Sequence, residues 1–246
     1  HEAKAMYERA QKMPGISVVG VDVHIGSQIT DLTPMRLAFT KVVGLVRELR
    51  DMGVPISRID LGGGLGIPYK SGETPASPAE YAEMVRDVVG DLDVQLILEP
   101  GRMIAGNAGI FVSRVEYIKE RDEREFAILD AAMNDLMRPA LYQAVHELLP
   151  VTRAEDRQSR TYDIVGPVCE STDRFAKGYS VQELRETDLV AFMSAGAYGA
   201  VMSNQYNTRP LCAEVLVNGD QAELVRRAPT FDEMIANERV PEWLKS

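Results

Sequence analysis

The chain has 246 residues, of which 45% are hydrophobic and 26% charged, and its net charge at pH 7 is −10. This composition is typical of a globular protein with one large domain or two smaller ones. The acidic balance and the lack of a Lys/Arg run argue against nucleic acid as a partner. No apolar run approaches the roughly 18 residues of a membrane span.

The first hundred residues alternate between helical and strand patterns. The segment 16–23 is nearly continuous in apolar character, as is typical of a parallel strand covered on both faces. Thr33-Pro34 is predicted to be an N-cap followed by proline at the first helical position, and 77–80 reads as a capping box. Helices are predicted over 2–13, 33–52 and 77–89, and strands over 16–23, 56–61 and 94–98. The pattern predicts β-loop-α repetition.

The pattern changes near residue 105, where strands follow one another without long helices. Such a run favours an antiparallel domain. Strands are predicted over 110–119, 125–129, 161–165, 188–193, 211–217 and 223–225, with a closing helix over 229–237.

The fold class expected is therefore α/β in two domains. Three βα units are too few to close an eight-stranded barrel. We expect 1–104 to be the last part of a (β/α)8 barrel and 105–246 to be an antiparallel all-β domain with a C-terminal helix. The start of the chain, His1-Glu-Ala-Lys4, lacks Met and opens inside a helical pattern, so the missing strands are expected before it.

The chain has few cysteines and histidines, which limits the disulfides and metal sites that it could form. Cys169 and Cys212 do not make a disulfide framework, so the reducing cytoplasm is the expected compartment. The histidines His1, His24 and His146 form no cluster with metal-ligand spacing, and no metal site is expected.

A glycine-rich motif, Asp60-Leu-Gly-Gly-Gly-Leu-Gly-Ile-Pro-Tyr69, follows the second predicted strand. Consecutive glycines let backbone N–H groups approach an anion closely, so a phosphate fits this motif. The spacing matches neither the dinucleotide fingerprint nor the nucleotide P-loop. A tight turn without a ligand is the alternative interpretation.

A second motif, Glu99-Pro-Gly-Arg102, follows the third predicted strand. It places a carboxylate and a guanidinium three residues apart around a Pro-Gly turn. Parallel α/β folds collect their catalytic groups at strand ends of this kind.

Six motifs follow one another along the chain, at 24–28, 60–64, 99–102, 134–142, 166–173 and 196–199. Together and in this order they resemble the diaminopimelate decarboxylases, pyridoxal-phosphate enzymes of the alanine-racemase-like barrel class. The resemblance runs nearly from end to end. It implies decarboxylation of meso-2,6-diaminopimelate to L-lysine and CO₂, in lysine biosynthesis, by a homodimer with shared active sites.

The resemblance also implies a role for each residue near the cofactor. Glu99 would face the pyridine nitrogen, where a carboxylate stabilises the protonated ring and so the carbanion left by CO₂ loss. His24 would stack on the ring face. The alternative interpretations are a solvated turn residue for Glu99 and a satisfied interior side chain for His24. The other implied cofactor-binding positions are Ser27, Gly63, Gly64, Pro100, Gly101, Arg102 and Tyr198.

Diaminopimelate carries an amino-acid group at each end, so the carboxylate far from the cofactor needs a planar two-point donor. Arg138 stands in the apolar setting Leu-Met-Arg-Pro-Ala-Leu and resembles that donor. Glu170 would pair with the distal ammonium, and Cys169 would return a proton to the carbanion, both across the dimer interface. The implied substrate-binding positions are Arg102, Arg138, Tyr142, Glu170 and Tyr198.

The lysine that forms the Schiff base with the cofactor in this family has no counterpart here, because no lysine stands in a matching context. We therefore expect the chain as given to be an inactive fragment. Two alternatives stay open. One is a related decarboxylase acting on ornithine, arginine or carboxynorspermidine. The other is a non-catalytic homologue that dimerises with the active enzyme.

Overall fold

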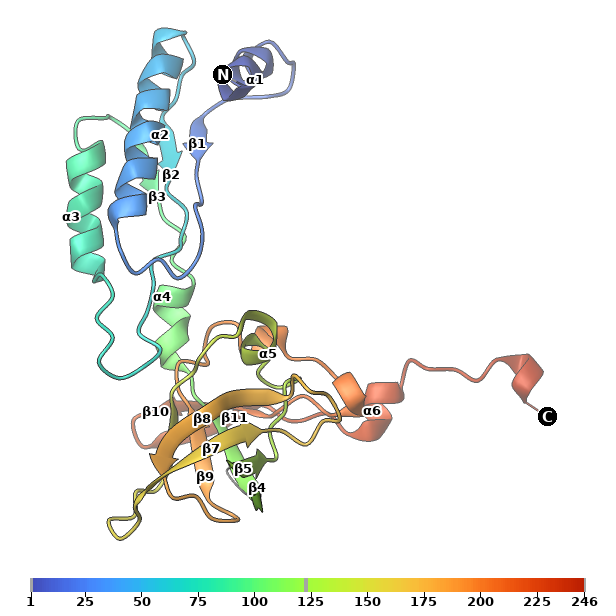
Figure 1. Ribbon diagram of the computed structural model, residues 1–246. Coiled ribbons are helices and arrows are strands. Elements are labelled where there is room, and N and C mark those ends of the chain that lie inside the picture. Colours follow the sequence, from blue (N-terminus) through green and yellow to red (C-terminus); the bar gives the residue numbers. More distant parts are fainter. Residues whose placement is uncertain (1, 122–123, 246) are drawn as a thin grey trace. The chain divides into compact units, whose positions relative to one another are not determined.

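The computed structural model describes residues 2–121 and 124–245. The chain divides into two compact units, His1–Ala108 and Gly109–Ser246. Figure 1 shows the order of the elements, with helices and strands alternating in the first unit and strands dominating the second. The protein is thus mixed α/β.

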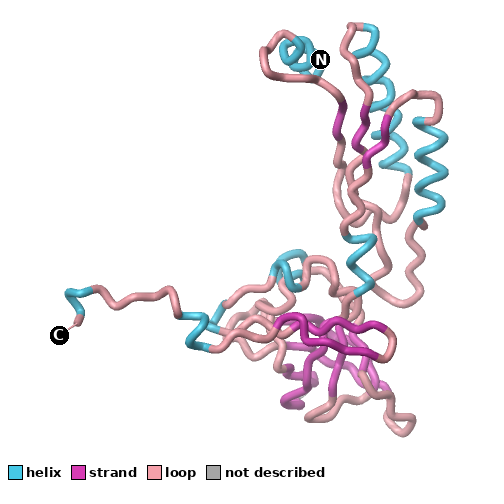
Figure 2. Tube along the Cα trace, turned by 180° about the vertical axis from the view of Figure 1, so that it is seen from behind, coloured by secondary structure: helices cyan, strands magenta, loops and turns pink. Residues whose placement is uncertain are grey.

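The first unit contains a three-stranded parallel sheet in the order β1-β2-β3. Helices α2 and α3 connect successive strands (Figure 2), so the predicted β-loop-α repetition is present. The strands are β1 (Gly20–Asp22), β2 (Arg58–Asp60) and β3 (Gln95–Ile97). The helices are α1 (Glu2–Gln11), α2 (Thr33–Asp51), α3 (Pro78–Val89) and α4 (Arg102–Ala105), followed by η1 (Gly106–Ala108).

The core of the first unit lies between the sheet and these helices. Helix α2 buries Phe39, Val46 and Leu49 at helical spacing, and Ile59 of β2 belongs to the same cluster. Burial of such side chains supplies about 1.5–3 kcal/mol each. The amphipathic pattern of the sequence therefore predicts this helix correctly.

The two predicted helix starts have different outcomes. At α3 the capping box is present, because Ser77 Oγ accepts from the Glu80 N–H and the Glu80 carboxylate accepts from the Ser77 N–H. At α2 the N-cap is Leu32, not Thr33. Asp31 Oδ1 accepts from the Thr33 N–H at 2.9 Å, so the cap prediction is wrong by one residue.

Strand β3 lies at an edge of this sheet, and its side chains are exposed. Leu96, Ile97 and the following Leu98 are 41%, 37% and 48% exposed. Parallel sheets are normally covered on both faces. This edge therefore offers unpaired backbone groups and an apolar surface.

The second unit contains a six-stranded sheet in the order β6-β9-β4-β5-β7-β8. Neighbouring strands are antiparallel except β5 and β7, which are parallel. The expectation of a wholly antiparallel sheet is wrong for that pair, because the chain between β5 and β7 is long enough for a crossover. The strands are β4 (Phe111–Arg121), β5 (Arg124–Leu129), β6 (Leu148–Pro150), β7 (Ser159–Val165), β8 (Arg174–Gln182) and β9 (Leu189–Phe192).

Short helices and a hairpin complete this unit. Helix α5 (Arg138–Tyr142) precedes β6, and β10 (Glu214–Asn218) pairs antiparallel with β11 (Gln221–Arg226). The predicted closing helix is α6 (Phe231–Ile235). Short 3₁₀ helices lie at η2 (Ala200–Met202), η3 (Tyr206–Thr208) and η4 (Glu242–Leu244).

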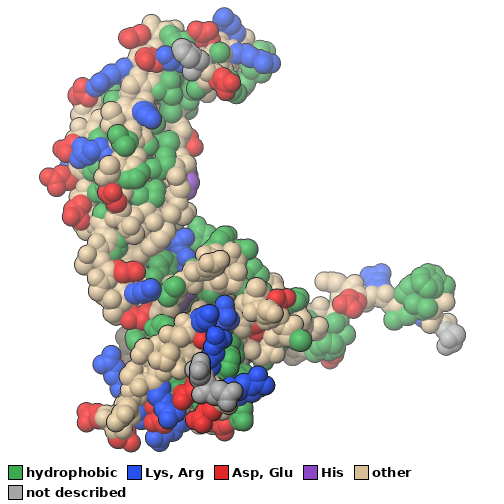
Figure 3. Space-filling model, viewed as in Figure 1, with side chains coloured by type: hydrophobic (Ala, Val, Ile, Leu, Met, Phe, Trp, Pro, Cys, Tyr) green, Lys and Arg blue, Asp and Glu red, His purple; other side chains and the backbone are tan. Residues whose placement is uncertain are grey.

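Charged side chains of both signs are interspersed on the face that Figure 3 shows. Within the described residues, no helix combines the length and the apolar character needed to cross a membrane.

Candidate active site

The parallel strands of the first unit end at one edge of the sheet and bring three carboxylates together there. Asp22, Asp60 and Glu99 each place an oxygen within 4.8 Å of the others. Asp60 Oδ1 also accepts a hydrogen bond from the Gly62 N–H at 2.9 Å. So much negative charge in one place favours a cation or a protonated ring over a neutral group.

The glycine-rich loop passes very close to neighbouring backbone. A Cβ at Gly63 would lie 2.3 Å from the carbonyl oxygen of Glu99, and one at Gly64 would lie 2.2 Å from that of Gly26. Gly64 also has φ +100°, which side chains disfavour. Packing alone therefore requires glycine here, and a phosphate role needs a separate observation.

That observation is a cavity of about 410 Å³ in the first unit, whose walls include both predicted phosphate-binding segments. Residues 62–65 of the glycine-rich loop and 100–103 of the Pro-Gly turn line it. The rest of its lining is mainly apolar and comes from α3, with Tyr81 and Val85, and from β3 and the residue that follows it, with Leu96 and Leu98. Glycine residues on one part of the wall and a volume in the small-ligand range fit a phosphorylated cofactor.

Arg102 begins α4 and is held by Tyr69, the last residue of the glycine-rich motif. Its Nη1 donates to Tyr69 Oη, and its guanidinium carbon lies 5.7 Å from the centre of the Tyr69 ring. Tyr69 is 8% exposed, and its N–H donates to Glu73 Oε2. The sequence assigned no role to Tyr69, which has no distinguishing neighbour except the glycines.

His24 follows β1 and contacts the glycine-rich loop. The Gly63 N–H donates to His24 Nδ1 at 3.3 Å, so that nitrogen carries a lone pair. Ser27 lies exposed in the same loop. Among the described residues, His24, Ser27 and Glu99 are not part of the cavity lining, whereas Gly63, Gly64, Pro100, Gly101 and Arg102 are.

In the second unit Arg138 begins α5 and is only 7% exposed, in keeping with its apolar sequence setting. Its Nη1 lies 2.8 Å from His146 Nε2. His146 is 4% exposed, and its Nδ1 lies 2.8 Å from the carbonyl oxygen of Met193. No role for His146 follows from the sequence, because nothing in its local pattern marks the contact with Arg138.

Two predicted tyrosines are accessible in this unit. Tyr142 ends α5 and is 63% exposed, and Tyr198 is 42% exposed. Tyr198 has φ +59°, in the left-handed region that few residues other than glycine adopt. Outliers of this kind cluster at functional sites.

Cys169 and Glu170 are exposed in the loop between β7 and β8. Asp173 anchors this loop, since its carboxylate accepts from the N–H groups of Val168 and Met133, both at 2.7 Å. Burial raises the pKa of Asp173, although these two hydrogen bonds act in the opposite direction. Asp173 thereby ties the loop of Cys169 to the segment that leads to Arg138.

Cys212 is also an exposed residue, but its thiol contacts an acidic side chain. Its Sγ donates to Asp135 Oδ1 at 3.3 Å. Burial, followed by the charge of Asp135, raises the pKa of Cys212 to about 12. This thiol is therefore protonated at neutral pH and suits a structural role.

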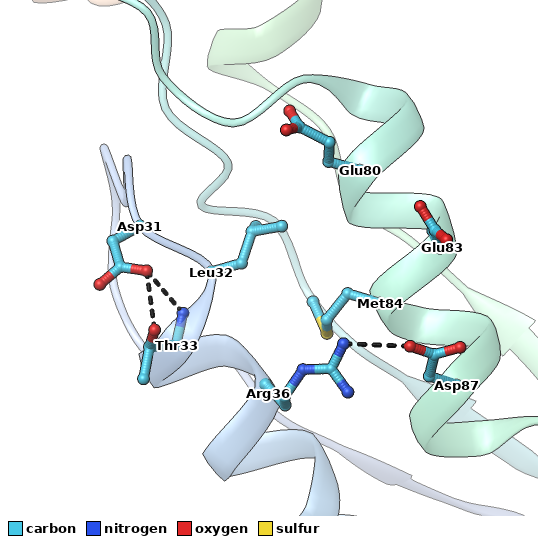
Figure 4. A pocket seen from close by; sticks show the side chains of 8 residues that line it. All are labelled: Asp31, Leu32, Thr33, Arg36, Glu80, Glu83, Met84 and Asp87. Atoms are coloured by element: carbon cyan, nitrogen blue, oxygen red, sulfur yellow. Dashed lines mark hydrogen bonds and ion pairs between the residues drawn. The ribbon is translucent and has the colours of Figure 1, made fainter.

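A second hollow, of about 370 Å³, lies between the start of α2 and one side of α3 (Figure 4). Arg36 Nη2 and Asp87 Oδ2 are 3.2 Å apart across it. Its remaining lining consists of Asp31, Leu32, Thr33, Glu80, Glu83 and Met84, and none of these is a predicted site residue.

Comparison with known proteins gives consistent matches along the chain. The family described as "Pyridoxal-dependent decarboxylase, C-terminal sheet domain" matches residues 8–196. A diaminopimelate decarboxylase of Pseudomonas fluorescens is 50% identical over 96% of this chain and 56% of its own length.

Two solved structures are also similar, and both are diaminopimelate decarboxylases complexed with L-lysine. The Helicobacter pylori protein is 36% identical with a TM-score of 0.90, over 96% of this chain and 58% of that one. The M. jannaschii protein is 34% identical with a TM-score of 0.94, over 98% of this chain and 56% of that one. The chain thus spans little more than half the length of these relatives.

Proposed function

The chain belongs to the pyridoxal-dependent decarboxylase family, and from this premise we propose that the protein to which it belongs converts meso-2,6-diaminopimelate into L-lysine and CO₂. The identity to a diaminopimelate decarboxylase of Pseudomonas fluorescens supports this reaction. So do the similar structures complexed with L-lysine, its product.

The observation that carries the choice of substrate is the buried guanidinium of Arg138. Arg138 is 7% exposed and lies against His146, so its guanidinium is held inside the second unit. A guanidinium offers two parallel N–H donors to a carboxylate. Diaminopimelate has a carboxylate at the end that does not react, whereas ornithine has none. Glu170 is proposed to receive the distal ammonium.

Pyridoxal 5′-phosphate supplies the electron sink that makes loss of CO₂ possible. We propose that Gly63, Gly64 and Gly101 surround its phosphate, because these residues line one cavity. The N–H groups of Gly64 and Gly101 donate to it, since the Gly63 N–H already donates to His24 Nδ1. Arg102, Pro100, Ser27 and Tyr198 complete the cofactor contacts.

The catalytic residues then have distinct tasks. Glu99 keeps a proton on the pyridine nitrogen, and the neighbouring Asp22 and Asp60 add to the negative potential there. His24 lies against the ring face. Cys169 donates a proton to the carbon that has lost CO₂. Tyr142 and Tyr198 contact the substrate.

The same proposal covers the architecture and the assembly. The sheet of the first unit is the last part of a (β/α)8 barrel, and its uncovered β3 edge is where the first strand of the barrel pairs to close it. The second unit is the β domain of the family. The cofactor lysine lies outside this chain. A cytoplasmic homodimer places Cys169 and Glu170 in the partner's site.

The test is a decarboxylation assay on the full-length protein with pyridoxal phosphate. We expect lysine and CO₂ from diaminopimelate, and little turnover of ornithine, arginine or carboxynorspermidine. Arg138→Lys should lower kcat/KM about tenfold to a hundredfold, from loss of a charge-assisted hydrogen bond of about 1.5–3 kcal/mol. Preferred turnover of ornithine would identify a related decarboxylase. No turnover of any of these, in a protein that dimerises with the active enzyme, would identify a non-catalytic homologue.

A further inference from the structure

His146 contacts the guanidinium of Arg138 in the second unit. The chain reverses after α5, where Gln143 has φ +54°, and this reversal brings His146 back to the guanidinium. The distances of 2.8 Å from His146 Nε2 to Arg138 Nη1, and from His146 Nδ1 to the Met193 oxygen, place the ring between two polar groups. Both side chains are buried, so the contacts are shielded from water.

These partners determine the protonation state of the ring. A guanidinium offers only donors, and a backbone carbonyl oxygen only accepts. Both contacts are hydrogen bonds only if Nδ1 carries the hydrogen and Nε2 carries the lone pair. The imidazole is therefore neutral, because a proton on Nε2 would place a donor against a donor and a cation against a cation.

A neutral partner has a particular consequence for Arg138. It fixes the direction of a long, flexible side chain without neutralising the positive charge of the guanidinium. A carboxylate in the place of His146 would hold Arg138 equally well, but it would compete with a ligand carboxylate for the same donors. Because the side chain is already ordered, a ligand does not bear the entropy cost of ordering it.

We propose that His146 is a positioning residue that sets substrate specificity: its neutral imidazole holds the Arg138 guanidinium in place to receive the distal carboxylate of the substrate. This inference rests on the proposed function, in which Arg138 binds that carboxylate. It gives His146 a role that is performed through Arg138.

The test compares two ligands that differ only in this carboxylate. Decarboxylation removes the carboxylate at the reacting end, so L-lysine keeps the distal one, and cadaverine is lysine without it. The ratio of their dissociation constants therefore reports the contribution of the distal carboxylate. Calorimetric titration of the full-length holoenzyme measures both constants without requiring turnover.

Three substitutions separate the two hydrogen bonds of His146. The amide of His146→Gln can accept from Arg138 and donate to the Met193 oxygen. The shorter His146→Asn can keep the Met193 contact but cannot reach Arg138. His146→Leu keeps much of the volume and makes neither bond. We expect His146→Asn and His146→Leu to weaken lysine binding about tenfold, the worth of one hydrogen bond.

Cadaverine binding should change little in these variants, and His146→Gln should stay close to wild type for both ligands. If His146→Asn and His146→Leu keep the wild-type preference for lysine, His146 does not position Arg138. Equal weakening of both ligands would show a structural role and would also overturn the inference. A wild-type protein that binds lysine no better than cadaverine, or does not decarboxylate diaminopimelate, would instead overturn the proposed function itself.

Discussion

Glu99 is the residue whose chemistry depends most on its immediate neighbours. Its carboxylate stands with those of Asp22 and Asp60 at the ends of three parallel strands. The side chains come from β-strand ends far apart in the sequence, so the sheet itself creates this concentration of charge. One carboxylate among three is well placed to hold a nearby cationic ring.

Replacing Glu99 by Gln should mainly lower kcat in the full-length enzyme. The change keeps the shape but removes the charge that stabilises the protonated pyridine nitrogen, and this stabilisation matters more in the transition state than in the ground state. Steady-state kinetics with diaminopimelate measures the effect. Asp22→Asn is a matched control that removes a neighbouring charge, and it should lower kcat less than Glu99→Gln does. A Glu99→Gln enzyme with wild-type kcat would remove Glu99 from this role.

Cys212 should resist alkylation while the protein is folded. Its pKa of about 12 leaves almost no thiolate at pH 8, and only the thiolate reacts. Labelling with iodoacetamide at pH 8, followed by peptide mass mapping, should leave Cys212 unmodified. Raising the pH toward 12 should accelerate its modification, as long as the fold persists. Denatured protein is the control, in which Cys212 should react readily at pH 8. Rapid labelling of the native protein at pH 8 would contradict the raised pKa of Cys212.

Single residues differ in how far the sequence could predict their roles. The burial of Arg138 could be predicted because its sequence neighbours are apolar. Tyr69, His146 and Asp173 could not be assigned. Tyr69 contacts Arg102, 33 residues away, and Asp173 contacts Met133, 40 residues away. Contacts of this kind depend on the tertiary fold and leave no local pattern.

Among the elements, the glycine-rich loop has the tightest packing requirement. Its backbone lies against the carbonyl oxygens of neighbouring strand ends, so any side chain there would displace main chain. Helix α2 provides a contrast within the same unit. Gly44 lies in its middle, and a Cβ there would meet nothing within 4 Å.

The same substitution should therefore have opposite effects at these two positions. Gly63→Ala should destabilise the protein by about 1–3 kcal/mol, because the Cβ would overlap the Glu99 carbonyl oxygen. Gly44→Ala should stabilise it by up to about 1 kcal/mol, through the better helix propensity of alanine. Thermal unfolding of the cofactor-free full-length protein measures both. Equal shifts for both variants would mean that the loop can relax at no cost.

The elements with local signals could be predicted, and the others could not. Helix α3 has a capping box and proline at its start, so its beginning is correct in the sequence analysis. Strand β8 was missed although it spans Arg174–Gln182. Its sequence includes Lys177 and Gly178, and Gly178 has φ +59°, where the pairing with β7 shifts register. The neighbouring strand, not the β8 sequence, determines that this segment is extended.

At the scale of the whole molecule, the proposal requires two chains for each active site. Cys169 lies on an exposed loop that Asp173 holds firmly, which is a suitable arrangement for reaching into a partner's site. In a symmetric dimer each chain then gives Cys169 to one site and receives it in the other.

Mixed dimers of the full-length protein can test this sharing. One subunit would carry Cys169→Ala and the other would lack the cofactor lysine. We expect about one working site in two within each mixed dimer, because one site then contains both intact groups. Activity is measured after co-expression with two affinity tags, which isolates the mixed species. The two parent homodimers are the controls. If isolated mixed dimers show no activity above them, Cys169 acts in its own subunit or not at all.

The open edge of β3 has a practical consequence for handling this chain by itself. Leu96, Ile97 and Leu98 stand exposed beside backbone groups that no strand of the described sheet occupies. An apolar strand with a free edge can recruit the same strand from another molecule. Such association becomes faster as the protein concentration rises. The concentration therefore determines how long the isolated chain remains usable in solution. Dilute preparations should keep longer than concentrated ones, even at temperatures far below unfolding.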